Sequence, residues 1–396
     1  MNIRLSNRVQ RIKPSPTLSV SARAAALKAA GKNIISLGAG EPDFDTPQHI
    51  KEAAIRAIQS GMTKYTAVDG TPGLKQVIIA KFKRDNGVDY TPRQILVSCG
   101  GKQSFYNLAQ ALLNSGDEVI IPAPYWVSYP DMVLLADGKP VIISTGVEQG
   151  FKITPRQLAA AITPKTRLLV LNSPSNPTGV AYTRAELAAL GEVLRRHPHV
   201  LVASDDMYEH ILWSKEPFCN ILNICPDLYE RTLLLNGVSK AYAMTGWRIG
   251  YAGGPEDLIQ AMANVQSQST SNPASISQAA AQAALEGDQS CIRGMCQAFK
   301  ERHDFVVEAL NAIHGVKCLP GQGTFYSFPS MQEVIERLDG IDDDVDLAEY
   351  LINEAGVAMV PGSAFGAPGY LRLSFATGMD TLREALKRVA AALNEK

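Results

Sequence analysis

The sequence predicts an α/β protein with a mainly parallel sheet flanked by helices, followed by a smaller α+β domain. Three observations predict this architecture: short apolar segments recur along the middle of the chain, helical patterns separate them, and the pattern changes near residue 290. Strands that alternate with helices form βαβ units, whose parallel sheet is covered by helices on both faces. The length of 396 residues corresponds to about two or three domains.

Five predicted strands make up the sheet, and each ends within a few residues of Gly, Pro, Asn, Asp or Ser. Their high content of Val, Ile and Leu is typical of parallel strands that are buried on both faces. The predicted strands cover residues 94–98, 118–121, 167–171, 200–203 and 232–235. After the first strand, apolar side chains recur at helical spacing over residues 102–114, and Gly116 follows as a stop signal.

A different pattern follows residue 290 and predicts the smaller domain. Helices are expected over residues 292–313 and 346–354, strands within 324–328, 357–360 and 370–375, and a final amphipathic helix over 381–393. We therefore expect a large α/β domain over residues 46–290 and a small α+β domain over residues 291–396. Residues 1–45 are expected to form an N-terminal arm and a segment that packs with the small domain.

Composition and charge narrow the class of protein. The formal net charge of −1 gives no reason to expect nucleic-acid binding, and no apolar run is long enough to predict a membrane span. The basic N-terminus lacks the apolar core of a secretory signal. Six cysteines without a CxxC spacing favour a reduced, cytoplasmic enzyme, and six histidines without an HExxH spacing give no reason to expect a metal site.

The turns after the strands are where the functional groups of a parallel sheet are expected. Gly100 and Gly101 follow the first strand and lead into a helix, whose free N–H groups would bind a phosphate. A plain tight turn is the alternative at this position. Neither a GxGxxG motif nor a GKS or GKT motif occurs, so the predicted phosphate site is not of a nucleotide-binding type.

Five further polar side chains follow the third, fourth and fifth strands. They are the amide of Asn176, the carboxylate of Asp205, the phenol of Tyr208, the amine of Lys240 and the guanidinium of Arg248. Taken singly, each has an ordinary structural explanation, such as a turn residue, a helix cap or a surface charge. Together they would stand at one edge of one sheet, which indicates an active site.

Seven motifs occur in the order that is typical of a known family. They are GEPDFDTP (40–47), GGKQ (100–103), PYWVSYP (124–130), NSPSNPTG (172–179), SDDMYEH (204–210), SKAYAMTGWRIG (239–250) and LRLSF (371–375). Through these motifs, essentially the whole chain resembles the class I aminotransferases of the pyridoxal 5′-phosphate fold type I superfamily, specifically the bacterial aspartate aminotransferase branch. The resemblance implies a large domain with a seven-stranded-type sheet, pyridoxal 5′-phosphate as cofactor, and a homodimer with shared active sites.

The resemblance also implies roles for the residues around the cofactor ring. Lys240 would form the Schiff base and act as general base, which requires a pKa well below the ordinary value of about 10.4. Asp205 would pair with the ring nitrogen, and Tyr208 and Asn176 would bind the 3-oxygen of the ring. Trp126 would stack on the ring face, with a plain core aromatic as the alternative. Both Trp126 and Asn176 would also contact the substrate.

The cofactor phosphate would be bound by the backbone N–H groups of Gly101 and Lys102 and by the guanidinium of Arg248. Tyr65 matches the family's tyrosine that reaches the phosphate of the neighbouring subunit. Gly237 departs from those relatives that carry a serine three residues before the Schiff-base lysine. The phosphate would therefore depend more on the other donors.

The substrate carboxylates would be bound by cationic side chains. Arg372 would bind the α-carboxylate with two N–H groups, and the backbone of Gly40 would contact the same carboxylate. A distal carboxylate needs a second cation, for which Lys102 and Lys13 are the candidates. A lysine holds such a group less rigidly than a forked arginine does.

The activity that the resemblance implies is amino transfer from aspartate to 2-oxoglutarate by a ping-pong mechanism. Three alternatives stay open: an aminotransferase of the same branch with a preference for prephenate, aromatic amino acids or alanine, a pyridoxal-phosphate-dependent β-lyase, and a cofactor-binding regulator. Contacts with the distal group of the substrate decide among the aminotransferases. Release of pyruvate and ammonia without a keto-acid acceptor would identify a β-lyase.

Overall fold

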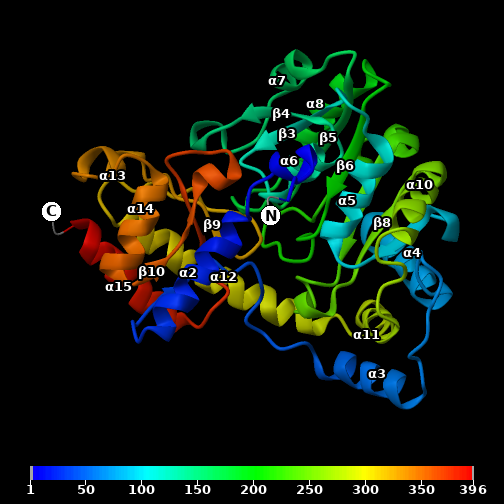
Figure 1. The fold of residues 1–396 in the computed structure, drawn as a ribbon, viewed down its shortest axis with the longest axis horizontal. Helices are drawn as coiled ribbons and strands as arrows, with labels where there is room; N and C mark the ends of the chain where they lie inside the picture. Colours follow the sequence, from blue (N-terminus) through cyan, green and yellow to red (C-terminus); the bar gives the residue numbers. More distant parts are fainter. Residues whose placement is uncertain (1–2, 395–396) are drawn as a thin grey trace.

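Seven strands form the central sheet in the computed structural model, which describes residues 3–394 (Figure 1). In spatial order they are β2 (Ile95–Ser98), β8 (Gly250–Gly253), β7 (Thr232–Gly237), β6 (Leu201–Asp205), β5 (Thr166–Asn172), β3 (Glu118–Ala123) and β4 (Lys139–Ser144). Neighbouring strands are parallel except at β8, which is antiparallel to both β2 and β7. The predicted fold class, a mainly parallel seven-stranded sheet flanked by helices, is confirmed.

Sequence reasoning found five of these strands and missed β4 and β8. β4 pairs only with β3, so it is an edge strand, where Pro140 is tolerated despite having no N–H to donate. β8 reads Gly-Tyr-Ala-Gly, and glycine is depleted in strands. A Cβ atom at Gly250 would stand 2.2 Å from the backbone nitrogen of Gly101, so glycine here lets β8 approach the turn after β2.

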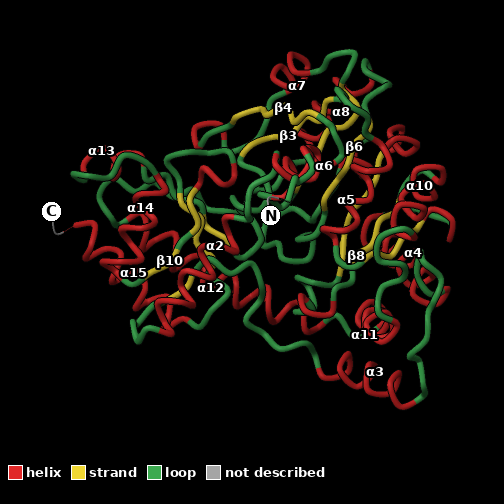
Figure 2. Tube along the Cα trace, in the orientation of Figure 1, coloured by secondary structure: helices red, strands yellow, loops and turns green. Residues whose placement is uncertain are grey.

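Two helical layers cover the sheet, because alternate strand residues point to opposite faces (Figure 2). In β7, Leu234 belongs to one buried cluster, whereas Leu233 and Leu235 belong to the other. The first cluster includes side chains of α3 (Gln48–Gln59), α4 (Pro72–Asn86), α7 (Pro155–Ala161), α8 (Arg184–Arg195), α9 (Ile221–Ile224) and α11 (Ser275–Glu286). The second includes side chains of α5 (Gly101–Leu112), α6 (Ser128–Leu135) and α10 (Glu256–Ser267). None of the helices in residues 3–394 has the length and apolar character that crossing a membrane requires.

The local sequence explains where several of these helices begin and end. α8 follows Thr183, whose hydroxyl accepts from the N–H of Glu186 while the Glu186 carboxylate accepts from the N–H of Thr183. α4 has Thr71 as its N-cap and ends at Gly87, which has a φ of 66°. α5 ends at Leu112, two residues earlier than the predicted range of 102–114.

The C-terminal part contains helices and short strands in alternation. Its helices are α12 (Ser290–Asn311), α13 (Gln332–Arg337), α14 (Asp344–Tyr350) and α15 (Met379–Asn394), with a π-helical turn over Leu351–Ala355. Its strands are β9 (Tyr326–Ser327), β10 (Val357–Ala358), β11 (Val360–Pro361) and β12 (Leu371–Ser374), of which β11, β12 and β9 form an antiparallel sheet. Each of the three predicted strand segments therefore contains at least one strand.

The N-terminal segment contacts both parts of the molecule. β1 (Ile35–Ser36) pairs in parallel with β10, and α2 (Pro16–Ala29) contributes Ala24 and Leu27 to a buried cluster with Ile352. α1 (Asn7–Gln10) lies against α6 instead, where Arg8 donates to Asp137 at 2.8 Å. The division of the chain at residues 45 and 290 stays a prediction.

Candidate active site

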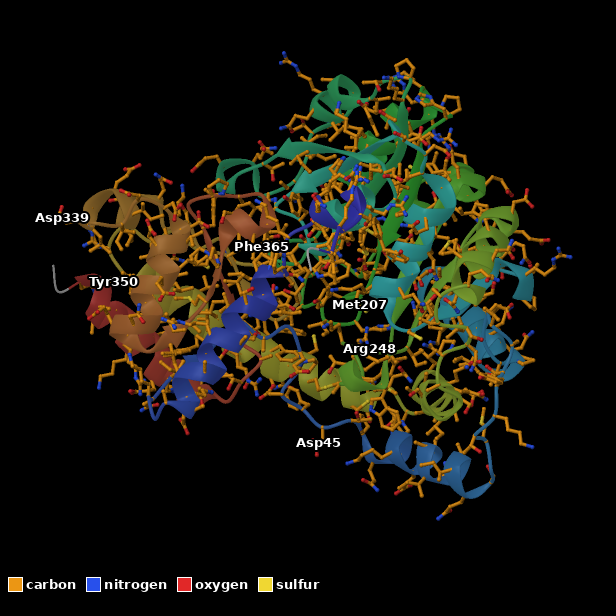
Figure 3. All side chains as sticks on the ribbon, viewed as in Figure 1. Asp45, Met207, Arg248, Asp339, Tyr350 and Phe365 are labelled. Carbon is orange, nitrogen blue, oxygen red and sulfur yellow. The ribbon has the colours of Figure 1, made fainter. Side chains whose placement is uncertain are left out.

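A cavity of about 440 Å³ lies at the carboxyl ends of the parallel strands. Three parts of the chain line it: the N-terminal segment, the turns after the central strands, and the C-terminal sheet. The lining includes Ser15, Thr17, Gly40, Gly101, Lys102, Trp126, Tyr129, Asn172, Asn176, Asp205, Met207, Tyr208, Lys240, Arg248, Tyr326 and Arg372. In Figure 3, the labelled Met207 and Arg248 lie near the middle of the molecule, and Phe365 comes from the C-terminal part.

The amine of Lys240 lies inside the cavity. Its Nζ donates to the carbonyl oxygen of Gly40 at 2.5 Å and lies 5.9 Å from the ring centroid of Phe325. Burial lowers the pKa of Lys240 to about 8, and the nearby guanidinium of Arg372 acts in the same direction. At pH 7 about a tenth of this amine is therefore unprotonated, far more than for an ordinary lysine, and this fraction can act as a nucleophile or a base.

The carboxylate of Asp205 is held by two donors. The hydroxyl of Tyr129 donates to Oδ2, and the backbone N–H of Met207 donates to Oδ1 at 3.2 Å. Burial raises the pKa of Asp205, whereas these two hydrogen bonds favour its ionised form. The result is an oriented acid that can hold a proton on a basic nitrogen.

Asn172 and Asn176 connect the ends of β5 and β6. The Asn172 side chain donates to the carbonyl oxygen of Asp205 at 2.9 Å and accepts from the N–H of Asn176 at 2.9 Å. The hydroxyl of Tyr208 is buried and lies 3.1 Å from the hydroxyl of Tyr326. Burial also raises the pKa of Tyr208, so its phenol is available as a hydrogen-bond donor.

Arg372 is only 2% exposed and also lines the cavity. Its Nη1 donates to Oδ1 of Asn176 at 3.0 Å, and its Nη2 donates to the carbonyl oxygen of Gly38 at 2.7 Å. The guanidinium lies over the rings of Tyr326 and Phe365, at 4.4 and 5.0 Å from their centroids. Within residues 3–394 no carboxylate forms an ion pair with this guanidinium, which makes it a suitable binding group for an anionic ligand.

Gly101 and Arg248 also line the cavity, and Gly100 lies against the guanidinium of Arg248. Gly100 has a φ of 89°, and a Cβ atom there would stand 2.3 Å from Nη2 of Arg248. Arg248 donates to the carbonyl oxygens of Thr245 and Cys99 at 2.9 and 3.3 Å. Glycine is therefore required for the guanidinium to approach the start of α5, where free N–H groups and the helix dipole favour an anion.

Trp126 and Lys102 meet at one side of the cavity. Nζ of Lys102 lies 5.2 Å from the ring centroid of Trp126, and the same indole makes an edge-to-face contact with Tyr129. Burial lowers the pKa of Lys102, with a further contribution from the positive charge of Arg248.

Two of the predicted site residues, Lys13 and Tyr65, lie outside the cavity lining. Gly237, the position where some relatives carry a serine, has little space around it. Lys13 is exposed and is not among the residues that line the cavity; its charge and backbone act on the carboxyl group of Asp131. Tyr65 is 92% exposed and also lies outside the cavity lining. At Gly237, a Cβ atom would stand 3.0 Å from the carbonyl oxygen of Ile249, so the approach of β8 to β7 leaves little room for a serine.

Comparison with known proteins decides the family. The family model for aminotransferase class I and II matches residues 32–389 of this chain. The chain belongs to this family. It is thus a transaminase, and its substrates are amino acids and keto acids.

This aminotransferase is similar along its whole length to several characterised sequences and structures. It is 63% identical to an aspartate/prephenate aminotransferase of Nitrosomonas europaea, over 99% of this chain and 100% of that one. The crystal structure of the aspartate aminotransferase from Rhizobium meliloti matches with a TM-score of 0.96 and 52% identity, over 99% of both chains. A Thermus thermophilus aspartate aminotransferase structure with maleate matches with a TM-score of 0.93 and 45% identity, over 99% of this chain and all of that one.

The sequence alone identified most of the functional residues of this aminotransferase's site, but several residues of the cavity lining were missed. The cavity contains ten of the twelve predicted site residues, all except Lys13 and Tyr65. Among the lining residues that were missed are Tyr129, Asn172 and Tyr326, together with Ser15 and Thr17 of the N-terminal segment. A signal existed for Tyr129, which follows Trp126 by three residues at the start of a helix and so returns to the same side. The sequence around Tyr326 gave no such signal.

Proposed function

We propose that this aminotransferase uses pyridoxal 5′-phosphate, transfers the amino group of aspartate to 2-oxoglutarate, and works as a homodimer. One observation carries the proposal: the buried amine of Lys240, with a pKa of about 8, shares a cavity with the carboxylate of Asp205 and the guanidinium of Arg372. The amine can remove a proton from the α-carbon of a substrate, the carboxylate can pair with the nitrogen of a cofactor ring, and the guanidinium can bind the α-carboxylate.

The residues present fit the proposed cofactor. The start of α5 with Arg248 is suited to a phosphate, because Gly100 and Gly101 leave space that side chains would fill. Two hydrogen bonds fix the carboxylate of Asp205. Trp126 offers an aromatic face to the same cavity. When bound, the cofactor supplies an aldehyde that condenses with amines and a ring that withdraws electrons from the substrate α-carbon.

The side chains of this protein would then position the substrate and move its proton. Arg372 would hold the α-carboxylate, since its guanidinium is buried and oriented by Asn176 and Gly38. Nζ of Lys240 would take the proton from the α-carbon of the substrate and deliver it to the aldehyde carbon of the cofactor. Asp205 would keep the ring nitrogen protonated. Two such half-reactions, with one keto acid released before the second binds, give ping-pong kinetics.

The preference for a dicarboxylic substrate is supported by Lys102. Its ammonium lies beside Trp126, within the cavity that also contains Arg372, so the two cations can bind the two ends of one short dicarboxylate. The relatives support the same choice, because their names specify aspartate, and maleate in the Thermus thermophilus structure is a four-carbon dicarboxylate.

The homodimer is supported by the position of Tyr65. Its side chain is 92% exposed, and Ile55 and Ile58 on α3 are also about half exposed. Large exposed apolar side chains that lie this close together in the sequence are typical of a surface that packs against a partner. A second copy of the chain would bring its Tyr65 to the phosphate end of this cavity.

One titration tests the proposal. The visible absorbance of the purified protein, reconstituted with pyridoxal phosphate, is followed as L-aspartate, L-alanine or L-phenylalanine is added without keto acid. We expect a visible band that L-aspartate bleaches at the lowest concentration. A band bleached first by alanine or phenylalanine would contradict the dicarboxylic preference, and the absence of any band would contradict the cofactor.

A second substrate, prephenate, is favoured by the name of the Nitrosomonas europaea relative. Prephenate carries an α-keto acid that Arg372 can bind and a second carboxylate for Lys102. Measured with a fixed amino donor, consumption of prephenate at a rate comparable to that of 2-oxoglutarate would support this activity. Release of pyruvate and ammonia in the absence of any keto acid would support a β-lyase instead.

A further inference from the structure

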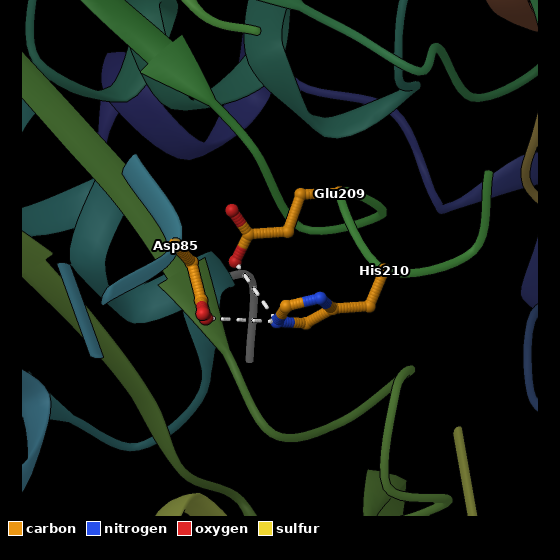
Figure 4. Close-up of side chains that lie close together, drawn as sticks. All are labelled: Asp85, Glu209 and His210. Atoms are coloured by element: carbon orange, nitrogen blue, oxygen red, sulfur yellow. Dashed lines mark ion pairs between the residues drawn. The ribbon is translucent and has the colours of Figure 1, made fainter. Parts of the chain in front are cut away.

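A buried ionic cluster lies behind the candidate active site, where α4 meets the turn after β6. Asp85, Glu209 and His210 place one potential ligand atom each within 4.8 Å of one another, as in a metal site (Figure 4). The fully buried side chain of Lys81 reaches the same place: its Nζ forms an ion pair with Glu209 and lies 3.8 Å from Oδ2 of Asp85. The chain thus supplies its own cation to this cluster.

The carboxylate of Glu209 is the centre of the cluster. Its Oε1 accepts from Nδ2 of Asn236 at 2.7 Å, and its Oε2 accepts from Nδ2 of Asn86 at 2.9 Å. Asn86 in turn accepts from Nζ of Lys81 at 2.9 Å. Burial acts to raise the pKa of Glu209, but the charge of Lys81 and these hydrogen bonds hold it below its ordinary value, so the group stays ionised.

This carboxylate connects two segments that face the active site. Glu209 directly follows Tyr208 in the turn after β6. Asn236 lies near the end of β7, four residues before Lys240, and its Oδ1 accepts from the N–H of Gly237 at 2.7 Å. Glu209 itself is not among the residues that line the cavity. Any effect it has on the chemistry must therefore act through Tyr208 and Lys240.

We propose that Glu209 is a positioning residue of this aminotransferase, whose carboxylate, paired with Lys81 and bound by Asn236, keeps the turn of Tyr208 in register with the segment of Lys240. The inference rests on the proposed function, because that function gives Tyr208 and Lys240 their roles. Removing one partner of a buried ion pair leaves the other charge unpaired, and the surrounding segments shift in response. A shift of about 1 Å at reacting groups lowers a rate by roughly a hundredfold.

The test compares Glu209→Gln, the double variant Lys81→Met with Glu209→Gln, and the control Lys83→Met, all as reconstituted holoenzymes. Lys83 belongs to the same helix, but its ion pair with Asp89 is exposed. Three quantities are measured: kcat with aspartate, the pH at which the visible band of the bound cofactor titrates, and the thermal midpoint. Glu209→Gln is expected to lower kcat by about tenfold to a hundredfold and to shift the titration, whereas Lys83→Met changes neither.

The double variant separates positioning from stability. Without an unpaired buried charge, its thermal midpoint should return toward that of the wild type. Its kcat should stay low, because a glutamine amide offers one acceptor oxygen to the two asparagine donors. A double variant that regains kcat together with its midpoint, or a Glu209→Gln variant that loses only thermal stability, would overturn the proposal.

A milder variant decides the question if Glu209→Gln does not fold. Asn236→Ala leaves the pair of Lys81 and Glu209 intact and removes one donor to the carboxylate, together with the acceptor of the Gly237 N–H. We expect a lower kcat and a shifted titration, and unchanged values would overturn the proposal. A wild-type protein that develops no visible band with pyridoxal phosphate would instead contradict the proposed function.

Discussion

The hydroxyl of Tyr129 donates a hydrogen bond to Oδ2 of Asp205, and both side chains lie in the wall of the candidate active site. Tyr129 is only 1% exposed, so water does not replace this bond when it is lost. The other carboxylate oxygen accepts from the backbone N–H of Met207. The tyrosine therefore fixes the plane of the carboxylate and favours its ionised form.

Tyr129→Phe removes this hydrogen bond with little change in shape. A hydrogen bond to a charged group contributes about 1.5–3 kcal/mol, so we expect pyridoxal phosphate to bind at least about tenfold more weakly, with a lower kcat. The measurement is reconstitution of the cofactor-free variant, followed by visible absorbance. Tyr106→Phe, in α5 and outside the cavity lining, is the matched control. Equal cofactor affinities in the two variants would contradict the role given to Tyr129.

Lys240→Met is expected to stabilise the cofactor-free protein at pH 7. The ordinary pKa of 10.5 falls to about 8 on folding, so at pH 7 folding must bury a charged amine. This depression destabilises the native state by on the order of 3 kcal/mol below pH 8, and the penalty fades as pH rises toward 10.5. Urea unfolding at pH 7, 9 and 10 should show wild-type stability rising relative to the variant. If the stabilities of the wild type and the variant changed with pH in parallel, the amine of Lys240 would not be buried in its charged form.

Lys102→Ala should weaken binding of dicarboxylic substrates selectively. Because a charged hydrogen bond contributes about 1.5–3 kcal/mol, KM for aspartate should rise about tenfold or more, with a much smaller effect on alanine. Lys13→Ala serves as the comparison, and we expect a smaller effect because Lys13 lies outside the cavity lining. Steady-state kinetics with both amino acids provide the measurement. Equal changes for aspartate and alanine would exclude Lys102 as the partner of the distal carboxylate.

Complementation between two variants tests the shared site. Lys240→Ala and Tyr65→Ala should each be poorly active as homodimers. In a mixed dimer, one of the two sites would combine an intact Lys240 with an intact Tyr65 from the partner. Unfolding and refolding an equal mixture should therefore restore roughly a quarter of wild-type activity, since half of the dimers are mixed and each has one complete site. No gain over the unmixed variants would mean that each site is built from a single chain.

The sequence was most informative about functional residues that stand at the ends of strands. Asp205 ends the buried strand β6 and Lys240 follows the buried strand β7, and the Val, Leu and Ala runs of these strands are visible without a structure. β8 escaped detection because glycines that permit close backbone contact weaken the pattern of a strand. Tyr326 escaped because it comes from a two-residue strand, and its meeting with Tyr208 depends on how distant segments pack.

Charged residues were harder to place than apolar ones. Lys13 was a candidate partner for the distal carboxylate, yet its surroundings at Asp131 depend on the path of the N-terminal segment, which no local pattern specifies. Lys81 would be expected on the surface of an amphipathic helix, because lysines are rarely buried. Its burial follows from Glu209, a residue 128 positions away along the chain. Periodicity alone does not predict such pairings.

The cavity wall contributed by Ser15 and Thr17 has a consequence for how new specificities arise. These hydroxyls belong to the start of the chain, whereas Asp205 and Lys240 lie at or just after the ends of strands in the central sheet. Part of the cavity wall is thus encoded in a stretch that can mutate separately from the residues of bond making. A library confined to residues 15–21 should yield enzymes that accept different amino acids while retaining proton transfer, and a gene duplicate could diverge by the same route.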